Sequence, residues 1–205
     1  MSSCYATGND CHSRSDRRKD VGAGREWADT TFLIILRGPA GAGKTTLARA
    51  LQSKVDDGLA VVDTDMFSWQ TVPGEPDKAL VYRNVTTVAR NYLQCRRSVI
   101  VAGLIITSEE AGAIDQLRRD AQADGVTFLD FYCWAPRSTV VERNQARRKN
   151  VPEEWVARWW HEAETDKRNV AWPLIELDMR RELPSLVHHV LDTVTAAQSP
   201  ADAPG

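Results

Sequence analysis

Hydrophobic residues fall into five short runs, and longer stretches with helical spacing separate these runs. The runs are rich in β-branched and aromatic residues and lie at 31–36, 60–62, 98–101, 126–132 and 174–177. The first run, TFLIIL, is apolar after its first residue, which is typical of a strand covered on both faces. Between the second and third runs, Val81, Val85 and Val88 recur at the spacing that gives a helix one apolar face.

This alternation of strands and helices predicts an α/β fold with a parallel sheet and helices on both of its faces. Residues 1–26 and 196–205 are polar and without periodicity. They are expected to be disordered tails, because they bury too little apolar surface to offset the entropy of ordering. Residues 27–195 are then expected to form one domain. Trp155 and Trp159, four positions apart on a predicted helix, are expected to pack into its core.

Composition and charge narrow the class of protein. The chain has 205 residues with a net charge of −2, from 26 Lys and Arg against 28 Asp and Glu. This balance disfavours a dedicated duplex-DNA binder, although it allows a local basic channel. No apolar run approaches the ~20 residues that span a bilayer, and the N-terminus lacks the apolar core of a secretory signal. These features predict a cytoplasmic enzyme without a membrane partner.

The segment GPAGAGKTT at 38–46 carries the strongest chemical signal, the pattern G-x-x-x-x-G-K-[ST] between a predicted strand and a predicted helix. Glycines let the backbone turn tightly and aim N–H groups at phosphate oxygens, and the helix start adds its positive end. Lys44 can reach the β- and γ-phosphates, and the Thr45 hydroxyl can bind Mg²⁺. The predicted nucleotide-binding residues are Gly38, Ala40, Gly41, Ala42, Gly43, Lys44, Thr45 and Thr46.

Two aspartates, Asp63 and Asp65, follow the second run. Ligands of parallel sheets bind beyond the carboxyl ends of the strands, so both carboxylates are expected beside the γ-phosphate. A carboxylate there can accept the proton of an acceptor hydroxyl as a general base. Period-two alternation puts both on one side, so either can serve. The alternative is a helix cap after the strand.

An arginine-rich stretch follows the fourth run. Arg143 and Arg147 are four positions apart and project from one face of a predicted helix. Such a pair can clamp phosphate oxygens as negative charge spreads during phosphoryl transfer. The alternative is a solvated basic face paired with Glu142.

At this point the chain resembles the small P-loop kinases, the group of polynucleotide 5′-kinases, zeta-toxin-like kinases and chloramphenicol phosphotransferase. The resemblance rests on the loop at 38–45, the aspartate after the second run and the Pro…Glu-Arg-Asn-x-x-Arg stretch at 136–147. It implies a three-layer P-loop NTPase fold with five parallel strands, ATP with Mg²⁺, and phosphoryl transfer to a hydroxyl. Asp65 aligns with the general base, and Asp63 is its nearest substitute. Arg143 and Arg147 match the arginines of a lid at 136–150.

The chain departs from the P-loop pattern after the third run. Many P-loop enzymes place a metal-orienting aspartate there, whereas this chain has Val101-Ala102-Gly103-Leu104. Metal support is therefore expected from Thr45 and Asp63, together with water or the phosphates.

In the kinases that this chain resembles, the region between the second and third strands shapes the acceptor pocket, here residues 66–97. Trp69 could stack on a planar acceptor and Arg83 could bind an anionic group. The alternatives are an anchored surface loop and an exposed helix arginine.

The predicted function is ATP-dependent phosphorylation of a hydroxyl on a small molecule such as an antibiotic, a nucleoside or a sugar-like compound. A polynucleotide 5′-hydroxyl or nucleotide-sugar kinase is the first alternative, and the near-neutral charge weighs against a nucleic-acid partner. A nucleotide-dependent switch or ATPase module is the second alternative. The sequence lacks the Asn-Lys-x-Asp motif of a GTPase and the apolar strand ending in Asp-Glu of a mechanical ATPase. The acceptor, the choice between ATP and GTP, and the oligomeric state stay open.

Overall fold

Five parallel strands form one sheet in the computed structural model, which describes residues 31–55, 58–68, 77–103, 108–146, 151–167 and 170–198. The strand order is β2-β3-β1-β4-β5. Each strand matches a predicted run to within two residues at either end: β1 is Phe32–Arg37, β2 Ala60–Asp63, β3 Val99–Ala102, β4 Thr127–Trp134 and β5 Ile175–Asp178. The predicted parallel sheet is therefore confirmed.

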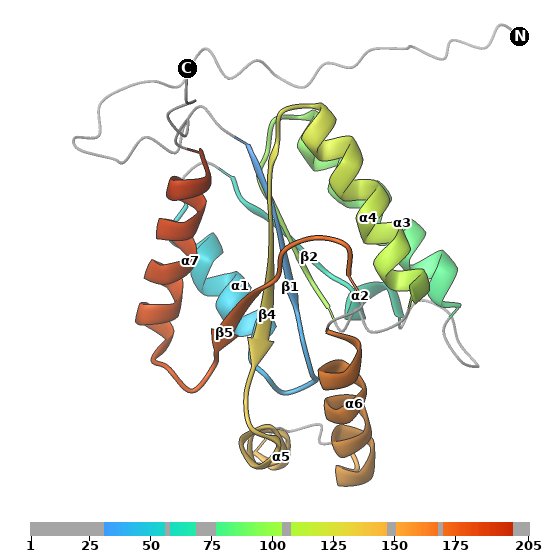
Figure 1. Cartoon of the computed structure of the whole chain (residues 1–205), viewed down its shortest axis with the longest axis vertical. Coiled ribbons are helices and arrows are strands. Elements are labelled where there is room, and N and C mark those ends of the chain that lie inside the picture. The colour runs from blue at the N-terminus through green and yellow to red at the C-terminus, as the bar shows by residue number, and fades with distance from the viewer. Residues whose placement is uncertain are drawn as a thin grey trace, which may run out of the picture.

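Helices cover both faces of the sheet, which gives three layers (Figure 1). One face carries α1 (Lys44–Gln52) and α7 (Leu183–Gln198), and the other carries α3 (Lys78–Gln94) and α4 (Ser108–Ala123). The short α2 (Asp65–Ser68) follows β2 directly. Beyond the carboxyl ends of the strands lie α5 (Arg137–Gln145) and α6 (Glu153–Asp166).

The central strand β1 is buried along its whole length, which explains its unbroken apolar sequence. Phe32, Ile34 and Leu36 pack with α1 and α7, whereas Leu33 and Ile35 pack with α3 and α4. Two hydrophobic cores therefore meet at one strand. The phosphate-loop motif begins one residue after that strand ends.

Helix α6 corrects one expectation about the core. Trp155 is 43% exposed and contacts Trp159 at 6.0 Å between ring centroids, so Trp155 does not pack into the core. Val156 and Ala163 are the buried residues of this helix instead. Trp160 packs against the core and donates its indole N–H to the carbonyl of Ala135 at 2.9 Å.

The two expected tails fall largely outside the described residues. Residues 1–26 lie outside them, as do residues 199–205. Helix α7 continues to Gln198, three residues into the stretch where the C-terminal tail was expected. Within the part of the chain that the structure describes, no helix combines the length and the apolar character needed to cross a bilayer.

A close contact joins the carboxyl ends of β2 and β3. The amide of Thr64 donates to the carbonyl of Ala102 at 2.9 Å, and the amide of Gly103 donates to Leu36 at 3.0 Å. A Cβ atom on Gly103 would lie 2.5 Å from both Oγ1 and Cγ2 of the buried Thr64. The Thr64 side chain thus fills the space beside Gly103 at the end of β3.

We expect Gly103→Ala to lower the free energy of unfolding by about 1–3 kcal/mol, the usual cost of overpacking. Gly112→Ala is the matched control, because a Cβ there has no neighbour within 4 Å. That helical substitution should stabilise the protein by about 0.5–1 kcal/mol. Urea unfolding measures both. Equal free energies for the two variants would contradict the contact with Thr64.

Candidate active site

The loop that joins β1 to α1 has the backbone geometry of a phosphate cradle. Gly41 and Gly43 adopt φ angles of 89° and 106°, which side chains of L-residues rarely allow. At Gly38, a Cβ would lie 2.6 Å from the carbonyl oxygen of Cys133. Burial raises the pKa of the Cys133 thiol to about 12, so this cysteine packs against the loop as a neutral group.

The start of α1 presents backbone amide groups to an anion. Gly43 is its N-cap and provides no side-chain hydrogen bond to the first turn, which holds Lys44, Thr45 and Thr46. Helix starts carry unpaired N–H groups and a positive dipole end, so this arrangement fits phosphate. The Lys44 ammonium lies over the same loop and donates to the carbonyls of Gly38 at 2.7 Å and Pro39 at 3.0 Å.

A hydroxyl and a carboxylate meet next to the loop. Thr45 Oγ1 donates to Asp63 Oδ2 at 3.0 Å, which joins the start of α1 to the end of β2. Asp63 Oδ1 accepts from the amide of Asp65 at 3.1 Å. These oxygens suit Mg²⁺, which usually binds one or two carboxylates together with substrate phosphates and water. Among the described residues, no group of three or more His, Cys, Asp or Glu side chains could hold a metal ion.

Asp65 differs from Asp63 in its surroundings. It is the first residue of α2 and is exposed, whereas Asp63 is partly buried. The structure thus places both predicted aspartates at the carboxyl edge of the sheet. It brings Asp63 into contact with the phosphate loop and leaves Asp65 at the solvent side, where an acceptor can reach it.

Arg143 on α5 closes over the loop in a specific way. Its Nη1 donates to the carbonyl of Ala42 at 3.0 Å, and its Nη2 donates to the carbonyl of Met179 at 2.8 Å. Gly41 also touches this helix, since a Cβ there would lie 3.0 Å from Cγ1 of Val140. The guanidinium therefore links the loop to the segment after β5. Arg147, predicted to act with Arg143, lies outside the described residues.

A cavity of about 400 Å³ opens between the loop, α5 and the start of α7. Its lining includes Gly43, Thr46 and Arg143, together with Met179, Arg181 and Leu183. The last three residues come from the segment after β5, and the sequence analysis missed them because no motif marks them. A larger cavity of about 640 Å³ lies near the amino-terminal ends of β3 and β4, away from the predicted site residues. Its lining consists of Asn91, Leu93, Gln94, Cys95, Arg96, Asp124 and Val126.

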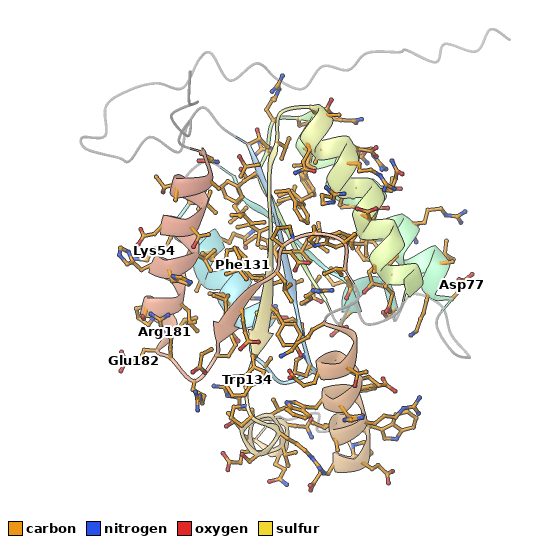
Figure 2. All side chains as sticks on the ribbon, in the orientation of Figure 1. Lys54, Asp77, Phe131, Trp134, Arg181 and Glu182 are labelled. Atoms are coloured by element: carbon orange, nitrogen blue, oxygen red, sulfur yellow. The ribbon has the colours of Figure 1, made fainter. Side chains whose placement is uncertain are left out.

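Two neighbouring arginines after β5 have different environments. Arg180 forms hydrogen bonds to Asp178, which lower the pKa of that carboxyl to about 2, and its guanidinium lies 5.1 Å from the ring centroid of Trp134. Arg181 lines the cavity and donates to Ser185 Oγ at 2.7 Å. Figure 2 places Trp134 and Arg181 toward the same end of the sheet.

The expected acceptor side is only partly described. Arg83 lies on the exposed face of α3 and forms no ion pair with another described residue. Trp69 lies outside the described residues. The expected roles of both residues in acceptor binding therefore stay predictions.

Comparison with known proteins finds relatives that are similar to part of this chain. Residues 33–165 match the family model described as "AAA domain". The 2′,3′-cyclic-nucleotide 3′-phosphodiesterase of Mus musculus is 37% identical over 86 residues, which are 42% of this chain and 20% of that protein. The adenylyl-sulfate kinase of Myxococcus xanthus (strain DK1622) is 29% identical over 119 residues, 55% of this chain and 63% of that protein. The chain thus spans about a fifth of the first relative and under two thirds of the second.

Solved structures share the whole domain at lower identity. A sugar kinase from Janibacter sp. HTCC2649 has a TM-score of 0.61 at 17% identity and covers 84% of this chain and 99% of its own. Shikimate kinase from Acinetobacter baumannii, in complex with shikimate, has a TM-score of 0.56 at 22% identity, with 83% and 96% coverage. The fold is therefore that of the small P-loop kinases, and the family match shows that the chain belongs to the AAA domain family.

Proposed function

We propose that this protein is an ATP-dependent kinase that transfers the γ-phosphoryl group to a hydroxyl of a small molecule. The observation that carries the proposal is the contact between Thr45 and Asp63 beside the phosphate loop, with Asp65 exposed two residues later. In this proposal, Asp63 contributes to the metal site and Asp65 faces the acceptor.

Phosphoryl transfer requires positioning and charge stabilisation more than covalent chemistry from the protein. The amides at the start of α1 and the Lys44 ammonium bind the phosphates. Thr45 and Asp63 hold Mg²⁺, which neutralises phosphate charge when bound. Asp65 orients the acceptor hydroxyl and takes its proton. Arg143, and Arg147 in the same stretch, stabilise the charge of the transferred group.

The 400 Å³ cavity fits the base and sugar of the nucleotide. It adjoins Gly43 and Thr46, so a nucleotide whose phosphates lie on the loop directs its base toward Arg181 and Leu183. Both terminal nitrogens of Arg143 already donate to backbone carbonyls. Arg181 uses one terminal nitrogen, which donates to Ser185 Oγ at 2.7 Å, so we assign its other terminal nitrogen to the base.

We infer the class of acceptor from the net charge of the chain and from the names of its relatives and structural neighbours. A nucleic-acid acceptor calls for a basic groove, whereas the chain has a net charge of −2. Adenylyl-sulfate kinase, a sugar kinase and shikimate kinase are among its relatives and structural neighbours, and their names refer to small acceptors. A polynucleotide or nucleotide acceptor is the second candidate, favoured by the match to cyclic-nucleotide phosphodiesterases.

A screen with labelled ATP tests the acceptor class. We expect transfer to at least one compound among nucleosides, sugars and hydroxyl-bearing antibiotics, at a rate nearly independent of salt. Transfer only to 5′-hydroxyl oligonucleotides, with affinity that falls steeply as salt rises, would support the second candidate. Hydrolysis of ATP without transfer to any acceptor would contradict the kinase assignment and favour a switch or ATPase module.

Separate roles for the two aspartates predict different kinetic defects. Asp63→Asn should raise the Mg²⁺ concentration for half-maximal rate by about tenfold or more, because it disturbs a group that orients the metal site. Asp65→Asn should lower kcat by ~10²-fold at an unchanged Mg²⁺ requirement, the usual size of a lost general base. Asp192→Asn on α7, far from the loop, is the control. If Asp63→Asn lowered kcat and Asp65→Asn raised the Mg²⁺ requirement, the two aspartates would have each other's role. Full activity of both variants would contradict the mechanism.

The assignment of Arg181 to the nucleotide base has a neighbouring control. Arg181→Ala should raise the Kd for ATP by about tenfold, the size of one charge-assisted hydrogen bond. Arg180→Ala should change it by less than about twofold, since Arg180 is already held by Asp178 and Trp134. Calorimetry with ATP, GTP and inorganic tripolyphosphate measures these effects. Equal weakening of tripolyphosphate binding by Arg181→Ala would show that Arg181 binds phosphate and not the base.

A further inference from the structure

A buried ion pair lies directly behind the phosphate loop. Arg37, the last residue of β1, is 3% exposed, and Asp130 in the adjacent strand β4 is 1% exposed. Arg37 Nε lies 3.3 Å from Asp130 Oδ2. The same face of β1 carries Leu33 and Ile35, so the two charges sit at the end of an otherwise apolar surface. Burial of two ions costs free energy that their attraction does not always repay.

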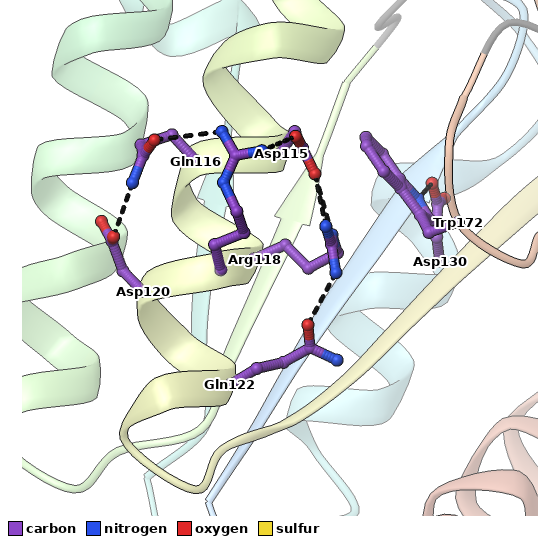
Figure 3. A network of polar contacts seen from close by, with 8 residues as sticks. Asp115, Gln116, Arg118, Asp120, Gln122, Asp130 and Trp172 are labelled. Carbon is purple, nitrogen blue, oxygen red and sulfur yellow. Dashed lines mark hydrogen bonds and ion pairs between the residues drawn. The ribbon is translucent and has the colours of Figure 1, made fainter.

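Both members of the pair also bind the segment between α6 and β5. Trp172 donates its indole N–H to Asp130 Oδ2 at 2.7 Å, and Arg37 Nη2 donates to the carbonyl of Lys167 at 3.2 Å. Helix α4 supports this segment, because the guanidinium of Arg118 lies 5.4 Å from the Trp172 ring centroid (Figure 3). The residue before Gly38 is therefore tied to the C-terminal end of α6.

The pair is incompletely satisfied. Among the described residues, Arg37 Nε and Asp130 Oδ1 are buried without a hydrogen-bond partner. Burial, the largest influence, raises the pKa of Asp130 to about 6, so the carboxyl is mostly ionised at neutral pH. Buried polar atoms without partners destabilise a fold, and an apolar pair of similar volume is often at least as stable. Stability alone therefore does not explain this pair.

The far end of α6 leads back to the phosphate loop. Val151, just before α6, exchanges hydrogen bonds with the buried side chain of Asn144 at 2.7 and 3.1 Å. Asn144 follows Arg143, which donates to Ala42 in the loop at 3.0 Å. The contacts form a closed ring from the loop through Arg37, α6 and α5 to Arg143 and back to the loop. A shift of Lys167 relative to β1 therefore displaces α6 and with it Arg143.

We propose that Arg37 and Asp130 are positioning residues for phosphoryl transfer, because they set the placement of α6 and thereby of Arg143 over the phosphate loop. The proposal rests on the proposed kinase function only for its effect on turnover. Its structural part requires nucleotide binding alone, since the loop and α6 are joined whether or not an acceptor is present.

The decisive variant is the double substitution Arg37→Met with Asp130→Leu, which removes both charges and leaves neither one unpaired. The variant also leaves the Trp172 indole N–H and the Lys167 carbonyl without their partners, so we expect its urea midpoint to stay near that of the wild type. Its kcat should nevertheless fall by about tenfold or more, because a small displacement of a transfer group is costly. The Kd for ADP should change by less than about twofold, because the loop amides and Lys44 are intact. A stable double variant with wild-type kcat would overturn the proposal.

Hydrogen exchange tests the same coupling without an acceptor. Addition of ATP and Mg²⁺ should slow amide exchange in α5 and α6 of the wild type, and this protection should be lost in the double variant while ATP still binds. Equal protection in both proteins would overturn the proposal. The wild-type protein could instead bind ATP, show slowed exchange in α5 and α6, and transfer phosphate to no acceptor. That result would contradict the kinase function but support the coupling between Arg37, Asp130 and α6.

A second substitution covers the case in which the double variant does not fold. Arg37→Lys keeps a positive charge for Asp130 but has one donor group in place of the guanidinium fork that reaches both Asp130 and Lys167. We expect a folded protein with lowered kcat and reduced protection of α6. Wild-type values of both would overturn the proposal, because the link to Lys167 would then be dispensable.

Discussion

The close approach of the phosphate loop to its neighbours is the constraint on which the site depends. At Gly38 the loop leaves no room for a side chain beside the β4 backbone, and at Gly41 it lies against Val140 of α5. The loop can hold its cradle shape only while β1, β4 and α5 keep these distances. Burial of β1 between two hydrophobic cores supplies that rigidity, because close-packed interiors do not deform gradually. The catalytic geometry is thus a consequence of how the centre of the sheet is packed.

The strands and the phosphate loop could be predicted from the sequence because their signals are local. A strand covered on both faces tolerates only apolar residues, and the loop needs glycine where its φ angles are positive. Asp63 ends a strand beside the loop, where it accepts a hydrogen bond from Thr45, and its role toward a metal stays a proposal. Each of these features depends on a few consecutive residues whose chemistry permits one arrangement.

Features made by contacts between distant segments escaped prediction. The bond from Arg143 to Ala42 joins residues 101 positions apart, and the cavity beside it is completed by Met179 and Arg181. Helical spacing indicated that Trp155 and Trp159 share a region of α6, but it does not state which side of a helix is buried. The buried residues of α6 are Val156 and Ala163, both smaller than tryptophan.

The arginines around the loop show why net charge says little about such a site. Arg37, Arg143 and Arg180 are each held by a different kind of partner, respectively a buried carboxylate, two backbone carbonyls and a carboxylate beside an aromatic ring. A guanidinium with fixed partners is preorganised, so it stabilises developing charge without reorganising at the moment of reaction. For Arg37 and Asp130, whose buried atoms are incompletely paired, the cost in stability is set against the proposed placement of α6 and Arg143. In our proposal, this placement is the reason that Arg37 and Asp130 are buried and incompletely paired directly behind the phosphate loop. The loop itself has no room to adjust its shape.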